Sequence, residues 1–307
     1  MPTVLAEQFI RKMRGGSQPA LLRCSDGLLY LVKFQGNPQT TSVLVNEYLA
    51  SRLAARIGLP VAEVSIVLVR NSLLLRSPEM YFELPEGRIK MSEGLHLGIR
   101  YVIAPSEGSV MDFLAPASLS RVSNITTFAG MLAFDLWTGN TDIRQAVYWK
   151  RFDEWTLNAC FIDQGYCFGG PRWEFSDHRP GRALYSNKTV YDRIADWIDF
   201  EPFLSRIENI RYADIEEIAK QIPTQWYKTW DQLLQLIEKV HRRRTAVRGL
   251  LRQCMAATAA AFPGWTTQSP LFSRFTPVNS EGGTERALGM SKPRSRSPKR
   301  HVRIGCA

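Results

Sequence analysis

The chain has 307 residues, of which 45% are hydrophobic and 22% charged, and its formal net charge is +10. These fractions are typical of a folded globular protein and exclude a largely disordered or collagen-like chain. The five cysteines are an odd number without a Cys-x-x-Cys pair, which argues against a disulfide framework and against a zinc site. A reducing, cytoplasmic setting is therefore expected. No apolar run reaches signal-peptide or membrane-spanning length, so we expect no association with a membrane.

The C-terminal segment is strongly basic and rich in Ser and Pro, and from residue 285 onward only Glu285 opposes its positive charges. We therefore expect residues 1–265 to form the folded domain and residues 266–307 to be a disordered basic tail. Such a tail either stays solvated or binds nucleic acid through its phosphates, without sequence preference. Its basic residues are Arg286, Lys292, Arg294, Arg296, Lys299, Arg300 and Arg303.

The first predicted element is a β-hairpin over residues 20–34, turning at Ser25-Asp26-Gly27. The alternation of its second strand places Lys33 on the same face as leucines. A helix is predicted over residues 42–58, with a Thr or Ser N-cap and Gly58 as its end. In that helix Glu47 is expected at the margin of the buried face.

Residues 61–76 are rich in β-branched side chains and predict a second hairpin around Asn71. The order strand, strand, helix, strand, strand indicates a small, largely antiparallel sheet with one helix packed on it, over about residues 1–95. The pattern then loosens into a connector near residues 96–104.

The remainder, about residues 96–265, is predicted to be mainly helical. A helix over 123–139, capped by Ser123 or Asn124 and ended by Gly139, precedes two strands at 146–151 and 157–163. Further helical patterns cover residues 189–207, 213–222 and 229–255. The run His241–Arg248 is interpreted as the exposed C-terminal part of a long helix. The expected fold class is α+β, with two lobes.

Four features carry candidate chemistry. Gly15, Gly16 and Ser17 precede a strand, where glycines allow backbone N–H groups to crowd an anion, although two glycines are also ordinary turn chemistry. Lys33 on an apolar strand requires a partner. Either Glu47 supplies it while the Lys33 ammonium reaches a nucleotide phosphate, or the Lys33 side chain extends to solvent.

The other two features are the polar loop Asn140-Thr-Asp-Ile-Arg-Gln145 and the lone charge of Asp163 in an apolar stretch. A hairpin between them brings Asp142 and Asp163 toward one point. Two carboxylates that meet repel each other unless a divalent cation neutralises them. Phosphoryl transfer requires this combination of backbone donors, a lysine, a metal-holding carboxylate and a carboxylate at the acceptor hydroxyl.

In this order, the segments "GGSQPALLR", "LYLVKFQ", "NEYLASRLAARIGLPV", "NTD" and "IDQG" resemble the HipA-like kinases and, more distantly, the phosphatidylinositol 4-kinases. The resemblance covers roughly residues 8–255. It implies a two-lobed protein-kinase-like fold, an ATP- and Mg²⁺-dependent phosphotransferase, and a hinge near residues 96–104 that binds the adenine.

Residue by residue, the resemblance implies that Lys33 contacts the ATP phosphates with Glu47 as its partner. Asp142 would orient the acceptor, and Asp163 would bind the metal. Asp135 is a second candidate for the catalytic aspartate, but it falls within a predicted helix, so Asp142 is favoured.

The sequence departs from the family pattern at Val147, where an asparagine five residues after the catalytic aspartate helps to bind the metal. Gln145 or Asn140 is the expected substitute, because an amide oxygen is an acceptable ligand for magnesium. Two functions stay open: a kinase for protein Ser or Thr hydroxyls, favoured over a lipid kinase, and a nucleotide-binding pseudokinase with a regulatory role.

Overall fold

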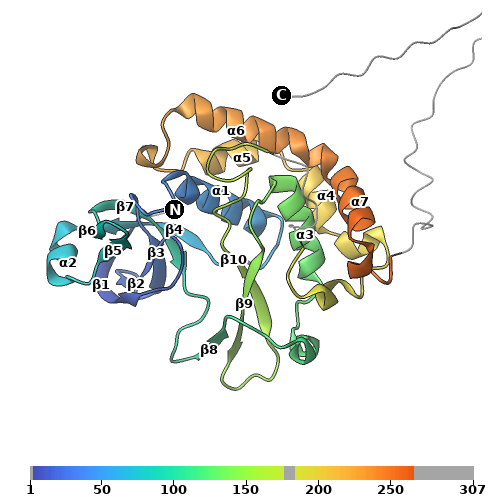
Figure 1. The fold of residues 1–307 in the computed structure, drawn as a ribbon, viewed down its shortest axis with the longest axis horizontal. Coiled ribbons are helices and arrows are strands. Elements are labelled where there is room, and N and C mark those ends of the chain that lie inside the picture. The colour runs from blue at the N-terminus through green and yellow to red at the C-terminus, as the bar shows by residue number, and fades with distance from the viewer. Residues whose placement is uncertain (1–2, 176–183, 266–307) are drawn as a thin grey trace, which may run out of the picture. The chain divides into compact units, whose positions relative to one another are not determined.

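The computed structural model describes residues 3–175 and 184–265, all of which belong to one compact unit (Figure 1). The basic tail and its predicted disorder and nucleic-acid binding lie outside the described residues. The structure has mixed α/β content, as the predicted α+β class requires.

A closed barrel of five strands forms the N-terminal part, in the order β1-β2-β3-β7-β4 (Figure 1). Neighbouring strands are antiparallel except β1 and β4, which pair in parallel and close the barrel. Closure gives each of the five strands a neighbour on both sides. The strands are β1 (Val4–Lys12), β2 (Ala20–Cys24), β3 (Leu29–Lys33), β4 (Val64–Val69) and β7 (Gly94–Arg100).

The predicted hairpin over residues 20–34 is confirmed as β2 and β3. Tyr30 and Val32 point into the apolar interior of the barrel, whereas Leu31 lies on the opposite face and is only partly buried. Lys33 ends β3 on that opposite face, as the alternation predicts.

The second predicted hairpin, around Asn71, is wrong. After β4 the chain forms a short helix, α2 (Asn71–Arg76), in which Leu73 and Leu74 are buried while Leu75 is exposed. The antiparallel partner of β4 is β7, a strand from farther along the chain. The local apolar pattern did not separate a short helix from a strand, and only the distant pairing decides between them.

The predicted connector at 96–104 is also displaced. Residues 94–100 are β7, which pairs with β3 on one side and β4 on the other, so the barrel extends beyond residue 95. Two further strands, β5 (Tyr81–Leu84) and β6 (Gly87–Lys90), form a separate hairpin that the sequence analysis left unassigned.

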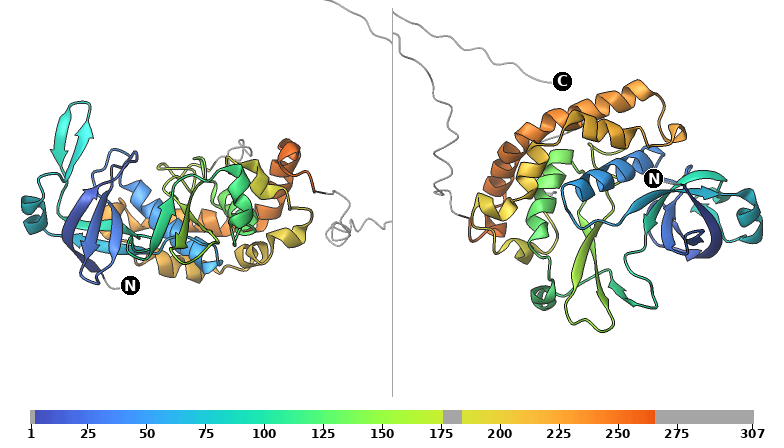
Figure 2. Two further views of the ribbon diagram at one scale, coloured as in Figure 1. Left: turned by 90° about the horizontal axis from the view of Figure 1, so that it is seen from below. Right: turned by 180° about the vertical axis from the view of Figure 1, so that it is seen from behind.

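Helix α1 (Ser42–Arg56) confirms the predicted helix and contacts β4 and β7 of the barrel as well as α5 (Tyr212–Ala219). Most of its side chains are buried, because it is covered on several sides. In Figure 2 α1 runs between the barrel and the helices of the C-terminal part. Thr41 is at its N-cap position, but the Thr41 side chain makes no capping hydrogen bond.

A second sheet contains β8 (Gly108–Met111), β9 (Gln145–Arg151) and β10 (Asn158–Ile162) in the order β10-β9-β8. The two strands predicted after residue 145 are thereby confirmed as the β9–β10 hairpin. The hairpin lies between α1 and α3 in Figure 1.

Helix α3 (Thr127–Thr138) is the central helix of the C-terminal part and ends at Gly139, whose φ of 61° is the left-handed conformation that favours glycine. Neither Ser123 nor Asn124 caps it. The amide of Asn124 instead pairs with the backbone of Ala159, and the helix begins three residues later.

Two long predicted helices are broken in the structure. The region 189–207 is divided among the 3₁₀ turns η3 (Lys188–Tyr191) and η4 (Trp197–Phe200) and the helix α4 (Phe203–Glu208). The Asp196 side chain caps η4, and Pro202 interrupts helical hydrogen bonding before α4. Residues 229–255 form α6 (Trp230–Arg243), η6 (Arg244–Ala246) and α7 (Val247–Ala257). The remaining 3₁₀ turns are η1 (Pro116–Arg121), η5 (Thr224–Trp226) and η7 (Ala259–Ala261).

The interpretation of the run His241–Arg248 as an exposed helix end is wrong for Arg243. Its guanidinium donates to the carbonyls of Leu136 and Trp137 at 2.9 Å, and so caps the last turn of α3. Across the described ranges 3–175 and 184–265, no helix has the length and apolarity to cross a membrane.

Candidate active site

Lys33 lies between two carboxylates at the end of β3. Its Nζ is 2.8 Å from Glu47 Oε2 and 3.0 Å from Asp163 Oδ1, and the residue is 6% exposed. Burial by itself would lower the pKa of Lys33, but the negative charges of Glu47 and Asp163 outweigh it and hold the pKa above its ordinary value. The ammonium is therefore charged, and the predicted Lys33–Glu47 pair is present.

Glu47 is fully buried, at 1% exposure, rather than at the margin of α1. Its Oε1 accepts a hydrogen bond from the backbone N–H of Gln164 at 2.9 Å, while Oε2 binds Lys33. A buried carboxylate is stable only when its oxygens are paired in this way. Glu47 thus connects β3 with the segment that follows β10.

Asp163 directly follows β10 and has a φ of 61°, a left-handed conformation that aspartate tolerates better than most side chains. Its carboxylate is 34% exposed. Oδ1 binds Lys33, and Oδ2 accepts from the Gln145 amide at 3.0 Å. Lys33, Glu47, Gln145 and Asp163 are therefore brought together from four different elements.

Asn140 and Asp142 lie in the loop between α3 and β9. The Asn140 side-chain oxygen accepts from the Asp142 backbone N–H at 3.1 Å, and Asp142 Oδ1 accepts from Ile143 N–H at 2.7 Å. The first bond is an ordinary Asx-turn contact, and both bonds fix the loop backbone. They leave Oδ2 of Asp142 for other partners.

The buried ion pair between Arg144 and Asp135 joins this loop to Asp163, and the sequence analysis missed it. Arg144 Nε is 2.9 Å from Asp135 Oδ2, and Nη2 binds the other oxygen. Nη1 of Arg144 donates to the carbonyl of Ile162 at 2.9 Å, next to Asp163. Asn140 donates to the same Asp135 carboxylate at 3.1 Å.

This network also bears on Asp135 as the alternative catalytic aspartate. Asp135 is 1% exposed and both of its oxygens accept hydrogen bonds, so an acceptor hydroxyl has no access to it. Burial lowers the pKa of Arg144, but the adjacent Asp135 charge outweighs this and raises the pKa above its ordinary value. Asp135 is a structural partner of Arg144.

Asn46 is a second residue that the sequence analysis missed. It is fully buried next to Glu47 on α1, and its side-chain N–H₂ group lies 2.9, 3.1 and 3.2 Å from the carbonyls of Gly165, Cys167 and Gly170. Its oxygen accepts from the Trp173 indole at 2.8 Å. A fully buried asparagine is rare without such partners, but the sequence around Asn46 gives no signal for them.

Gly165 lies two residues after Asp163, and a left-handed turn is not the reason for this glycine. Its φ is not in the left-handed region. A Cβ on Gly165 would lie 2.5 Å from Val43 Cγ1, so the glycine is required by its close approach to α1. Left-handed backbone conformations occur nearby at Asp163, Phe168, Gly169 and Gly170, whose φ angles are 61°, 62°, 77° and 79°.

A family model for HipA-like kinases matches residues 6–258, which include Lys33, Glu47, Asp142 and Asp163. The chain belongs to the HipA-like kinase family. No curated protein sequence matches it.

Solved structures with the same fold include a Helicobacter pylori proinflammatory kinase, CtkA. It is 15% identical with a TM-score of 0.52, and the match covers 81% of this chain and 95% of that one. The Golgi casein kinase is 9% identical with a TM-score of 0.50, over 83% of this chain and 74% of that one. At these identities the likeness shows a kinase-like fold and no more.

In this HipA-like kinase the glycine turn lies between β1 and β2. Gly15 has a φ of 136°, a conformation that only glycine adopts readily, and Ser17 is buried. A Cβ on Gly16 would lie 2.6 Å from the Gln39 amide. Within the described ranges, no hydrogen bond or ion pair joins this turn to Lys33.

Val147 lies on β9, paired in register with Cys160 of β10 and only 8% exposed. Gln145, two residues earlier, lies on the same face of β9, and it is exposed and bonded to Asp163. The HipA-like kinase described here therefore presents an amide at Gln145 and a buried aliphatic side chain at Val147.

Proposed function

We propose that this HipA-like kinase transfers the γ-phosphoryl group of ATP to a Ser or Thr hydroxyl of a protein, in a Mg²⁺-dependent reaction. The observation that carries the proposal is the Lys33 ammonium, held charged and buried between Glu47 and Asp163. A fixed cation next to a partly exposed carboxylate suits a nucleotide phosphate and its metal ion.

The residues present fit ATP and magnesium. Asp163 offers a partly exposed carboxylate and Gln145 an amide oxygen, which are the hard oxygen donors that Mg²⁺ prefers. Asn140 is the weaker candidate ligand, because its oxygen already accepts from Asp142 N–H. When bound, Mg²⁺ would neutralise the charge of the phosphates. The backbone N–H groups of Gly15, Gly16 and Ser17 are proposed to contact those phosphates.

Asp142 is proposed to act on the acceptor. Its Oδ1 is engaged by Ile143 N–H, and Oδ2 takes the proton of the acceptor hydroxyl as the hydroxyl oxygen bonds to the γ-phosphorus. The bond from that phosphorus to the β,γ-bridging oxygen breaks, and ADP leaves with the electron pair. Lys33 holds the phosphates in line for this displacement.

A nucleotide-binding pseudokinase is the second candidate, and Val147 is the observation that favours it. Val147 is an apolar, buried side chain where the family pattern expects a metal-binding asparagine. If Gln145 does not replace that ligand, the protein binds nucleotide without transferring phosphate and serves as a regulatory module.

The deciding experiment incubates the full-length protein with γ-labelled ATP and Mg²⁺, alone and with cell lysate, and measures ATP binding by calorimetry in parallel. We expect label transfer that Asp142→Asn abolishes and that the matched surface variant Asp192→Asn retains, since Asp192 is exposed outside the site. Metal-dependent binding without transfer would establish the pseudokinase. Absence of both binding and transfer would overturn the proposal.

Two wider assignments remain proposals. We place the kinase domain in residues 1–265, and we place the protein in a reducing, cytoplasmic compartment. The second assignment is supported by Cys24, Cys160 and Cys167, which are buried free thiols.

A further inference from the structure

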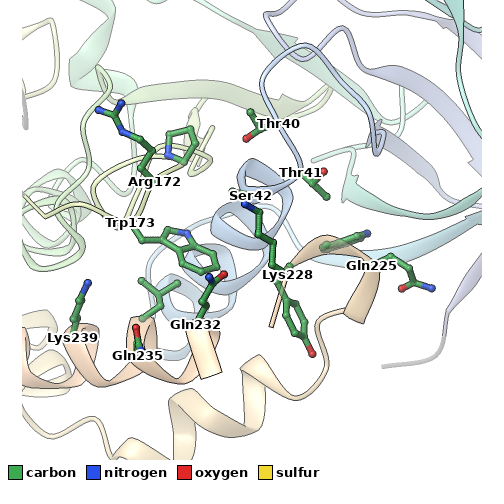
Figure 3. A pocket seen from close by; sticks show the side chains of 14 residues that line it. Thr40, Thr41, Ser42, Arg172, Trp173, Gln225, Lys228, Gln232, Gln235 and Lys239 are labelled. Carbon is green, nitrogen blue, oxygen red and sulfur yellow. The ribbon is translucent and has the colours of Figure 1, made fainter. Parts of the chain in front are cut away.

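A pocket of about 610 Å³ is lined by the start of α1, residues 171–173, η5 and α6 (Figure 3). Its lining does not include Lys33, Glu47, Gln145 or Asp163. Its lining includes Arg172, Lys228 and Lys239, three glutamines and two indoles. None of the described residues that line it is acidic. The pocket is therefore a basic, hydrogen-bonding cavity.

The two lysines of the pocket have no counter-charge among its lining residues. Arg172 forms an exposed ion pair with Glu174 at 3.2 Å. In the part of the chain that the structure describes, Lys228 and Lys239 form no ion pair. Two positive charges at one cavity, without an ion-pair partner in residues 3–175 and 184–265, favour an anionic ligand.

The shape of one wall indicates a peptide rather than a single ion. Gln232, Gln235 and Lys239 have the spacing i, i+3, i+7, which places them in a row along one face of α6. Figure 3 shows this row, with Trp173 and Ser42 on the other side of the pocket. From Gln232 to Lys239 the row is about 10 Å long at 1.5 Å per residue.

A length of about 10 Å is that of three residues of extended peptide. A glutamine amide has both a donor and an acceptor, so the row matches the alternating C=O and N–H groups of a peptide backbone. The buried Trp226 and Leu236 add an apolar floor for side-chain carbon atoms.

The pocket is also attached to the proposed active site. Trp173, which forms part of its wall, donates to Asn46 at 2.8 Å, and Asn46 in turn holds the segment that follows Asp163. Helix α1, whose first residue Ser42 lines the pocket, carries Glu47 five positions later. A ligand bound here is held next to the elements that position Lys33 and Asp163.

We propose that this pocket binds an acidic, extended segment of the phosphate-accepting protein, with carboxylates on Lys228 and Lys239 and peptide groups on the α6 glutamines. The inference rests on the proposed function in that the peptide belongs to the acceptor. Its binding step is independent of phosphate transfer.

The test measures fluorescence anisotropy of a labelled Gly-Glu-Glu-Glu-Gly peptide with the full-length protein, and of the matched peptide with Gln in place of Glu. We expect the acidic peptide to bind at least tenfold more tightly and to weaken as salt is added. The double variant Lys228→Glu, Lys239→Glu should reduce its affinity at least tenfold. The control Arg70→Glu, Lys90→Glu makes the same change in charge at exposed positions outside the pocket and should retain the affinity.

Equal binding of the two peptides, or equal loss in the two double variants, would overturn the inference. So would displacement of the peptide by inorganic phosphate at equal concentration, which would indicate a plain anion site, or by an oligonucleotide that binds more tightly through the same lysines. Asp142→Asn should bind the peptide as well as the unchanged protein. Absence of phosphate transfer by the unchanged protein, with peptide binding retained, therefore counts against the proposed function alone. Phosphate transfer by the unchanged protein without peptide binding counts against the docking site alone.

Discussion

Arg144 binds both oxygens of Asp135, nine residues before it in the chain, and both side chains are almost completely buried. The same guanidinium reaches the carbonyl of Ile162. The pair therefore connects the loop that carries Asp142 with the end of β10, which Asp163 directly follows.

Removing one partner of this pair should be severe. Asp135→Ala leaves a buried, uncompensated guanidinium, and we expect a loss of about 3–5 kcal/mol in the free energy of unfolding by urea. The exposed pair Arg242–Glu238, at 3.0 Å, is the control, and Glu238→Ala should cost less than about 1 kcal/mol. Similar losses in the two variants would show that the buried pair has no special role.

Asn46→Asp should destabilise the segment after Asp163. The change replaces an N–H₂ donor with an acceptor that faces the carbonyls of Gly165, Cys167 and Gly170, so we expect a loss of roughly 2–4 kcal/mol in unfolding free energy. Asn209→Asp removes one exposed contact to Ser205 and should cost less than about 1 kcal/mol. An Asn46→Asp protein as stable as the Asn209 variant would contradict this role.

Gly165→Ala tests the close approach of the post-β10 segment to α1. The new methyl group would lie 2.5 Å from Val43 Cγ1, and we expect a loss of about 1–3 kcal/mol in thermal or urea unfolding. In a protein that already carries Val43→Ala, the Gly165→Ala change should cost less unfolding free energy than it does in the unchanged protein, because Val43 Cγ1 is absent. Gly249→Ala in α7, where nothing lies within 4 Å of the added carbon, should be neutral or stabilising by up to about 1 kcal/mol.

Stability should fall in acid because of His96. Its ring is completely buried, Nδ1 accepts from Gln35 N–H at 3.0 Å, and burial lowers the pKa of His96 from 6.5 to about 4. Below pH 6.5 the unfolded chain binds a proton that the folded chain does not, so the folded state loses stability as the pH falls from 6.5 toward 4. The loss amounts to roughly 3 kcal/mol.

The measurement for His96 is urea unfolding at several pH values between 7.5 and 4.5, for the unchanged protein and for His96→Leu. The variant is expected to be less stable at pH 7.5, because Gln35 N–H loses its acceptor. The gap between the two proteins should narrow as the pH falls. A gap that stays constant over this range would disprove the assignment.

The sequence by itself determined the features that depend on neighbouring residues. The β2–β3 and β9–β10 hairpins, helix α1 and the Gly139 helix end follow from local periodicity and turn chemistry, and they were predicted. Because Lys33 and Asp163 lie at strand ends, their proximity to one site was also predictable, with the family resemblance as a guide.

Only the tertiary structure decided the long-range relationships. Three such relationships are the closure of the barrel by the β1–β4 pair with β7 between β3 and β4, the role of Asp135 as the partner of Arg144, and the four contacts of Asn46. They join residues whose local sequence is compatible with other arrangements. A buried polar group requires a partner, but the sequence does not say which distant donor or acceptor supplies it. The physical reason is that packing, and not local preference, selects one of several possible partners for each buried group.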